Sequence, residues 1–140
     1  GDRQRRFRWA IGPMLAGKRG LNVPQNWLDW TTTYGFIENV AAAVVHAIDA
    51  PAAKDAIFNI TDFEAVSHQV WIQRFASALG WTGDVRTELE VSHPLAQAAA
   101  ALDLSVPLKL SGERYVTVTG FNAPIDLSEA ITRTLEAERN

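Results

Sequence analysis

The clearest hydrophobic pattern in the chain predicts a helix over residues 40–50 that is followed by a strand. Its apolar positions recur at helical spacing and would form one buried stripe: Val40, Val44, Ala47 and Ile48. Pro51 would end this helix, and Glu38 or Asn39 is placed to cap its first turn. Residues 57–60 (Ile-Phe-Asn-Ile) then have the length and composition of a buried strand. We therefore predict an αβ unit of the kind that packs on a parallel sheet.

Two further helices carry start and stop signals. Ser67 is a predicted N-cap, Gly80 a predicted terminator, and the apolar positions between them share one face: Val70, Trp71, Phe75, Ala78 and Leu79. Near the end of the chain, Asp126 and Glu129 form a capping box that predicts the start of a last helix.

The remaining pattern is weaker. Residues 3–17 predict a helix with a kink or break at Pro13, because proline removes a backbone donor and clashes with the preceding turn. We expect extended segments at residues 21–24, 84–91 and 115–118 and an alanine-rich helix at residues 95–102. No internal repeat or low-complexity linker divides the chain. The prediction is one domain over residues 1–140, a small mixed helix-strand domain of the α/β class.

Composition fits one such domain. The chain has 140 residues, of which 47% are hydrophobic and 21% charged. It has no apolar run near the roughly 20 residues that a bilayer crossing requires, and its first residues lack the apolar segment of a signal peptide. We expect a cytoplasmic protein without a membrane partner. The absence of cysteine excludes disulfides, thiolate zinc sites and cysteine nucleophiles.

The formal net charge of −3 is distributed unevenly. Four of the 13 basic residues lie at the start of the chain: Arg3, Arg5, Arg6 and Arg8. Such an arm could contact nucleic-acid phosphates. A solvated helix face, or a segment that pairs with an acidic neighbour, explains the same arginines, and we favour this explanation.

Few residues are arranged for catalysis. His46, His68 and His93 have no second histidine at i+3 or i+4, and we expect them at surface or capping positions. Glu88 and Glu90 would share one strand face, either as an acid–base pair or, as we favour, as like-charged neighbours on a wet edge.

Signatures of cofactor chemistry are also missing. The sequence has no G-x-G-x-x-G turn, no G-x-S-x-G elbow and no Tyr-x-x-x-Lys pair, since Glu38 follows Tyr34 and Thr119 follows Tyr115 at that spacing. We predict that the chain alone neither binds a nicotinamide cofactor tightly nor transfers a hydride, and we predict no metal site. The aromatic run from Trp27 to Tyr34 would either line a pocket or fill the core.

Four stretches, in order, resemble one family. They are residues 1–3, residues 34–43 (Tyr-Gly-Phe-Ile-Glu-Asn-Val-Ala-Ala-Ala), residues 57–60, and Arg114 with the segment 120–136. Together they resemble the C-terminal, substrate-binding half of an extended short-chain dehydrogenase/reductase, the NAD-dependent epimerase/dehydratase family. Asn39 stands where that family usually has Asp, and as a helix cap Asn is nearly equivalent.

The resemblance implies a function. In this family the N-terminal half supplies the cofactor fold and the catalytic residues, and the C-terminal half closes over the substrate, commonly a nucleotide sugar. It therefore implies a substrate-binding part that binds no cofactor itself, is inactive alone, and works with NAD or NADP once paired with an N-terminal dinucleotide-binding half. The candidate substrate contacts are Val23 in an extended segment, Tyr34 as an aromatic wall and Arg114 as a phosphate-binding guanidinium.

The alternative is a non-catalytic module that keeps this fold but associates with itself or with another protein. Residues 57–60 would be covered by the other half in a complete family member, and exposed apolar edges bind partners. We therefore predict a homodimer. Nucleic acid, bound through the arginine arm, is the least favoured partner.

Overall fold

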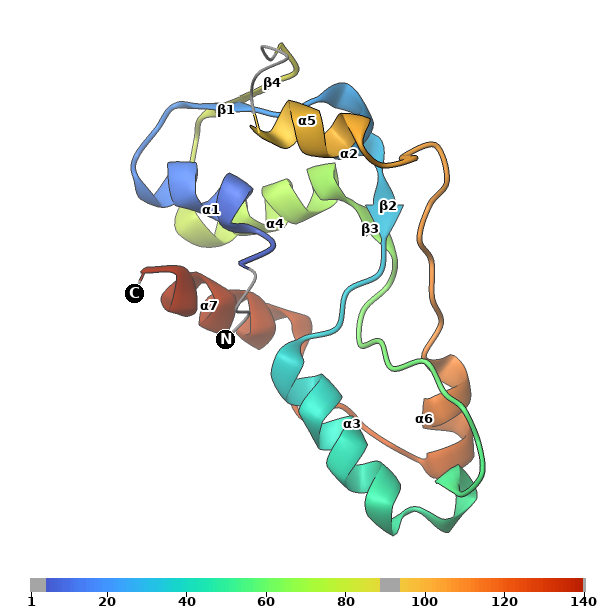
Figure 1. The fold of residues 1–140 in the computed structure, drawn as a ribbon. Coiled ribbons are helices and arrows are strands. Elements are labelled where there is room, and N and C mark those ends of the chain that lie inside the picture. Colours follow the sequence, from blue (N-terminus) through green and yellow to red (C-terminus); the bar gives the residue numbers. More distant parts are fainter. Residues whose placement is uncertain (1–4, 89–93, 140) are drawn as a thin grey trace.

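The computed structural model describes residues 5–88 and 94–139, in which one large and one small group of elements are joined by extended segments (Figure 1). The elements in chain order are α1 (Arg8–Leu15), β1 (Gly20–Asn22), α2 (Gln25–Asp29), β2 (Thr31–Thr32), α3 (Ile37–Asp49), the 3₁₀ turn η1 (Pro51–Ala53), β3 (Val66–Ser67), α4 (His68–Leu79), β4 (Asp84–Arg86), α5 (Pro94–Ala100), α6 (Glu113–Thr119) and α7 (Leu127–Arg139). None of the helices in these ranges is long and apolar enough to cross a membrane.

The strands are short and form two small sheets. β1 pairs with β4 in parallel, with Leu21 opposite Val85, and β2 pairs with β3 in antiparallel fashion, with Thr31 opposite Ser67. The predicted mixed α/β class is confirmed in this coarse form. The expected strand at residues 84–91 is seen only in β4; the described residues after Arg86 are not in a strand, and residues 89–91 lie outside the described ranges.

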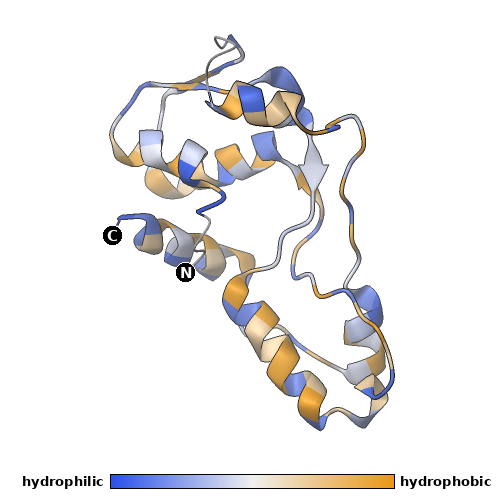
Figure 2. Ribbon diagram, in the orientation of Figure 1, coloured by the Kyte–Doolittle hydropathy of each residue, from blue (hydrophilic) through white to orange (hydrophobic). Residues whose placement is uncertain are grey.

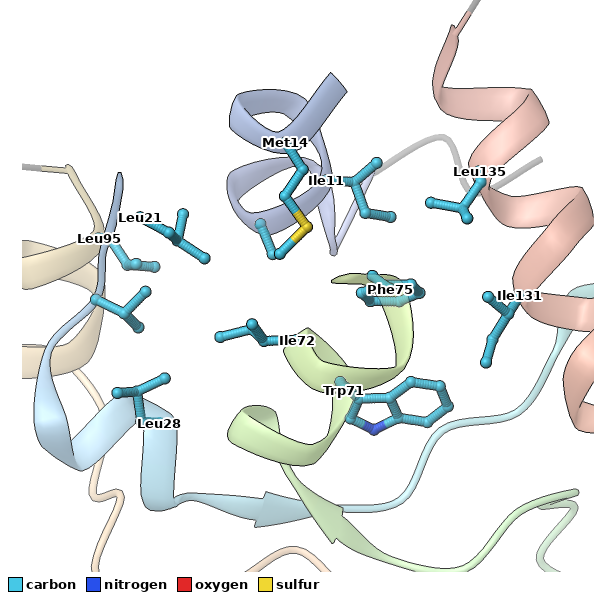
Figure 3. Packing of buried hydrophobic residues seen from close by; sticks show 12 residues of the cluster. Ile11, Met14, Leu21, Leu28, Trp71, Ile72, Phe75, Leu95, Ile131 and Leu135 are labelled. Carbon is cyan, nitrogen blue, oxygen red and sulfur yellow. The ribbon is translucent and has the colours of Figure 1, made fainter. Parts of the chain in front are cut away.

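The hydrophobic core lies in the large group, where α1, α4 and α7 pack together and β1, α2 and α5 close one side (Figure 3). The two ends of α4 lie where the sequence predicts them, although Ala78 of the predicted apolar face is exposed. The Ser67 hydroxyl accepts a hydrogen bond from Val70 N at 3.4 Å, and Gly80 ends the helix at φ +64°, a conformation that suits glycine. Trp71 and Phe75 carry the buried face of this helix.

The other two helices of the core differ in how closely they follow the sequence. Asp126 Oδ1 accepts from Glu129 N at 2.9 Å, which confirms the predicted cap of α7. α1 continues to Leu15, so the predicted break at Pro13 is wrong. Pro13 lies two residues before the end of α1, where it removes one hydrogen bond and interrupts little of the helix.

The small group contains α3, α6 and η1 (Figure 1). The strand expected at residues 115–118 is wrong, because these residues belong to α6. Gly120, at φ +71°, ends this short helix, and Tyr115 is buried against α3, where its hydroxyl donates to Ala43 O at 2.7 Å. Packing of one aromatic ring outweighs the β propensity of the neighbouring valine and threonine residues.

α3 differs from its prediction in two ways. Its N-cap is Phe36, so the expected cap by Glu38 or Asn39 is wrong, and Asn39 is instead buried. The predicted buried stripe is also wrong, because Val44 is 58% and Ile48 79% exposed. Asn39 and Ala43 are the buried residues of α3, whereas most of its large apolar residues, coloured orange in Figure 2, are exposed.

The predicted strand at residues 57–60 is wrong in this structure, and so is the αβ unit that depends on it. The segment is irregular, and Ile57 is 89% exposed. A strand requires a neighbour that satisfies its backbone groups. None of the described residues pairs with this segment as a strand, and Ile57 O accepts a hydrogen bond from the Arg114 side chain at 3.2 Å.

Candidate functional site: an aromatic pocket between α4 and α7

A pocket of about 460 Å³ lies where the segment before α1, the loop before α3, α4 and α7 meet. Aromatic side chains make up much of its wall: Phe7, Tyr34, Phe36, Phe63, Trp71 and Phe75. Ligand pockets in proteins commonly have volumes of about 300–1,000 Å³ and mostly apolar walls. The size and lining of this pocket therefore suit a small organic ligand.

The aromatic wall is built around Phe7. The Phe7 ring lies 4.8 Å from the Tyr34 ring, 5.3 Å from Trp71 and 5.0 Å from Phe75, measured between centroids. The rings are tilted or edge-on to one another, which are favourable arrangements for aromatic pairs. This packing holds the wall in place and leaves ring faces and edges toward the pocket.

Charged side chains surround the opening and are paired with one another. Arg133 Nη1 binds Glu38, and Arg133 Nε donates to Glu129 at 2.7 Å. Glu138, which also lines the pocket, accepts from Arg8 Nη1 at 2.9 Å. The pocket is thus largely apolar, and the arginines of the neighbouring ion pairs can also bind an anionic group of a ligand.

Tyr34 is held by a buried histidine. Its hydroxyl lies 2.8 Å from His68 Nε2, while His68 Nδ1 lies 2.9 Å from the carbonyl oxygen of Trp27. A carbonyl can only accept, so Nδ1 carries the proton and Nε2 accepts from Tyr34. Burial lowers the pKa of His68 to about 4, against which the bond to Trp27 acts weakly. His68 is therefore neutral at pH 7, and Tyr34 presents its ring to the pocket.

The loop that forms one wall is fixed by Asp62. The Asp62 carboxylate accepts from Phe36 N at 2.7 Å and from Asn39 Nδ2 at 3.0 Å. Asn39 also donates to Ile125 O at 2.8 Å and accepts from Ile125 N at 3.0 Å, which ties α3 to the segment before α7. Burial is the larger effect and raises the pKa of Asp62 above its usual value, although the two hydrogen bonds that the carboxylate accepts act in the opposite direction.

One polar group of the pocket residues lacks a partner. Trp71 Nε1 is buried and has no hydrogen-bond acceptor within the described ranges. A buried donor without an acceptor costs about 1–3 kcal/mol. Glu38, Arg133 and Glu138 of the pocket lining are held in ion pairs, and the Tyr34 hydroxyl is held by His68. We conclude that this arrangement suits the binding of a ligand.

The structure does not bring the three candidate substrate residues together. Tyr34 lines the pocket. Val23 is 0% exposed in the core, where its N–H donates to Arg86 O at 2.8 Å. Arg114 lies on α6, with its guanidinium carbon 5.1 Å from the centroid of the Phe58 ring. Substrate contacts by these three residues remain a prediction.

Several residues around the pocket were not identified from the sequence. His68 was expected at the surface or in a cap, which is wrong, because it is 1% exposed. The available signal was its spacing, since His68, Trp71 and Phe75 recur at i, i+3 and i+7 on one face of α4. His46 is half-buried with Nδ1 3.0 Å from the Tyr115 hydroxyl, and His93 lies outside the described ranges.

Two other expectations concern acidic residues and metals. Glu88 is exposed, and Glu90 lies outside the described ranges. Within residues 5–88 and 94–139, no group of three or more histidine, cysteine, aspartate or glutamate side chains is placed to hold a metal ion.

Comparison with solved structures supports part of the expected fold. RMD from Pseudomonas aeruginosa, determined in complex with NADPH, matches this chain with a TM-score of 0.68 at 13% sequence identity. The match covers 97% of this chain and 41% of the RMD chain. The chain shares its fold with part of RMD. This likeness is one of fold alone, and it supports the expected fold only in coarse form, as part of a larger chain.

Comparisons of sequence alone give no family. No protein-family model matches the chain, and no curated protein matches it. The chain spans less than half the length of RMD, so the likeness concerns the fold of one part.

Proposed function

We propose that this chain is the substrate-binding half of a cytoplasmic, NAD(P)-dependent protein related to nucleotide-sugar epimerases and dehydratases. The observation that carries the proposal is the match of nearly the whole chain to 41% of an NADPH-bound protein. The four stretches that resemble the C-terminal half of the family support the same assignment. The cofactor and the catalytic residues would then come from a dinucleotide-binding half, and this chain alone would be inactive.

The aromatic pocket is the proposed substrate site. A planar base would pack against the rings of Tyr34 and Phe7, and phosphates would lie near Arg133. Arg114 is proposed to bind phosphate from the small group, and Val23 to position the segment after β1. The assignment of Tyr34 has the most support, because this residue lies on the pocket wall.

A chimera tests this proposal. The matched 41% of RMD is replaced with this chain, and binding of NADPH and of a panel of nucleoside-diphosphate sugars is measured by calorimetry. We expect the chimera to bind both. Tyr34→Ala should weaken binding of the sugar nucleotide about tenfold by removing roughly 1–1.5 kcal/mol of ring contact, and leave NADPH binding unchanged.

Tyr34→Phe is the matched control, because it keeps the ring and removes only the hydroxyl that binds His68. It should bind the sugar nucleotide almost as well as the unmodified chimera. A folded chimera that bound neither NADPH nor any sugar nucleotide would contradict the proposal.

A second candidate function is that of a self-associating module, which the exposure of Ile57 favours. The residues around Ile57 would then form the contact of a homodimer. Light scattering on the isolated chain across a range of concentrations measures this directly. A strictly monomeric species at the highest concentration would count against the dimer.

A further inference from the structure

Residues 106–110, between α5 and α6, form a short extended segment beside β2, which we call the edge segment (Figure 1). The N–H of Leu108 donates to Thr31 O at 3.0 Å, and its carbonyl accepts from Thr33 N at 3.0 Å. Leu110 N donates to the Thr33 hydroxyl at 3.0 Å. The edge segment therefore extends the small sheet of β2 and β3 on one side.

The outer edge of this segment is open. Val106 O accepts from Trp30 Nε1 at 2.9 Å, so its carbonyl turns toward the chain, as the backbone of Leu108 does. In an extended strand the residues between them point their backbone groups the opposite way. Among the residues that the structure describes, none forms a hydrogen bond with the carbonyl of Pro107 or with the N–H and carbonyl of Lys109.

The edge segment also carries exposed apolar side chains. Val106, Leu108 and Leu110 share one face by strand alternation, and they are 61%, 50% and 47% exposed. Pro107 and Lys109 lie on the other face. An open strand edge is a template for pairing with another chain, and proline and lysine are residues that restrict such pairing. These two residues therefore limit how a partner can bind here.

We propose that the edge segment pairs in antiparallel fashion with the edge segment of a second copy of this chain, so that two small sheets join across a twofold axis. An antiparallel pair of identical strands is self-complementary, as a twofold contact requires. The inference does not rest on the function of the pocket, because no residue of the edge segment lines it. The contact also differs from the surface around Ile57.

Pro107 and Lys109 select one register for this pair. Pro107 opposite Pro107 would leave the centre without an N–H donor, and Lys109 opposite Lys109 would place like charges face to face, which destabilises a strand pair. Neither problem arises when Pro107 lies opposite Lys109 of the second copy. The Lys109 N–H of each copy then donates to the Pro107 carbonyl of the other.

The same register brings the exposed apolar side chains together. Leu108 lies opposite Leu108 of the second copy, and Val106 lies opposite Leu110. Leu108 forms a pair without direct hydrogen bonds, in which the Cα atoms are about 4.5 Å apart and the side chains are close. The register centred on Lys109 would instead place Val106 opposite Gly112, which has no side chain to contact. Apolar packing and charge therefore favour the same arrangement.

Disulfide trapping tests this contact, because the chain contains no cysteine. In Leu108→Cys the two thiols meet at a Cα separation that a disulfide can span. Lys109→Cys is the matched control, since it lies one residue further on and points to the other face. Ile57→Cys reports on the alternative contact in the small group. Each variant is oxidised in a glutathione buffer, and the covalent dimer is followed on non-reducing gels.

We expect Leu108→Cys to form the covalent dimer at least about tenfold faster than either control, because strand pairing raises the effective concentration of its two thiols. An equal rate for Leu108→Cys and Lys109→Cys would overturn the proposal. Faster trapping of Ile57→Cys would also overturn it and assign the dimer contact to the small group.

Sedimentation velocity gives a second test that requires no disulfide. Lys109→Pro removes the outward N–H and leaves the bonds from Leu108 to β2, whereas Lys109→Ala removes the same charge and keeps the N–H. We expect Lys109→Ala to remain a dimer and Lys109→Pro to be monomeric, with far-UV circular dichroism to show that both variants are folded. An unmodified chain that is monomeric at every concentration would overturn the proposal, whatever the chimera binds.

Discussion

α3 and α4 are helices of 13 and 12 residues with similar apolar periodicity, but the structure buries the apolar face of only one of them. α4 places Trp71 and Phe75 in the core between α1 and α7. α3 exposes Val44 and Ile48 and is held through its opposite face. Periodicity therefore identifies which face of a helix is apolar, while the packing of the rest of the chain determines whether that face is buried.

The largest expected effect comes from truncation of a core ring. Phe75→Ala should lower the free energy of unfolding by about 3–5 kcal/mol, because it leaves a cavity beside α1 and α7. Val44→Ala in α3 should change it by less than about 0.5 kcal/mol in the free chain. Urea unfolding followed by tryptophan fluorescence measures both. Similar losses for the two variants would contradict the difference between the helices.

The next largest expected effect is a pH dependence of the free energy of unfolding, which comes from His68 at the start of α4. The pKa of His68 is about 4 in the folded chain and about 6.5 in the unfolded chain, so protons favour unfolding. The stabilising contribution of neutral His68 is complete above about pH 6.5, is lost as the pH falls from 6.5 to 4, and changes little below pH 4. Between pH 7 and pH 4 the free energy of unfolding should drop by about 3 kcal/mol from this residue.

His68→Gln separates this effect from other titrations, since Gln has no pKa in the range. The variant should lose less stability between pH 7 and pH 4 than the unmodified chain, whatever its absolute stability. Asp62 acts in the opposite direction, because burial raises its pKa and protonation then favours the folded state. Identical pH profiles for the two proteins would show that His68 is not buried in neutral form.

Asn39→Asp distinguishes a helix cap from a buried link. If Asn39 were the cap of α3, Asp would be nearly equivalent. In the structure both Nδ2 bonds would be lost, and a second carboxylate would face Asp62. We expect a loss of about 1–3 kcal/mol at pH 7 that becomes smaller at pH 4, measured by urea unfolding at both pH values. A neutral result at pH 7 would favour the cap.

The parts of the fold that the sequence predicts correctly are those with local signals. Ser67, Gly80 and Asp126 act on backbone groups within a few residues, so α4 and the start of α7 can be located without knowledge of the rest. The helix at Tyr115 could not be predicted, because its anchor is the carbonyl of Ala43, far away in the chain. Residues 57–60 have strand character, but a strand also requires a neighbour, and none is described in this chain.

The candidate site was predicted to a smaller extent. Tyr34 was selected as an aromatic wall, and it lines the pocket. Phe7, Trp71 and Arg133 come from three other segments, and their meeting depends on how α1, α4 and α7 pack. Contacts between such distant segments produce no pattern of fixed spacing in the sequence. The burial of His68 was accessible from helical spacing alone and was missed because a lone histidine was assigned to the surface.

The smallest expected effect comes from a charge on the exposed apolar face of α3. Val44→Glu in the free chain should change the free energy of unfolding by less than about 0.5 kcal/mol, and Glu is the better helix former by a few tenths of a kcal/mol, which favours a small gain. The urea midpoint should therefore stay or rise slightly at an unchanged slope. A loss above about 1.5 kcal/mol would mean that Val44 is already covered in the free chain, since a buried charge without a partner is costly. α3 would then be as buried as α4 in the free chain.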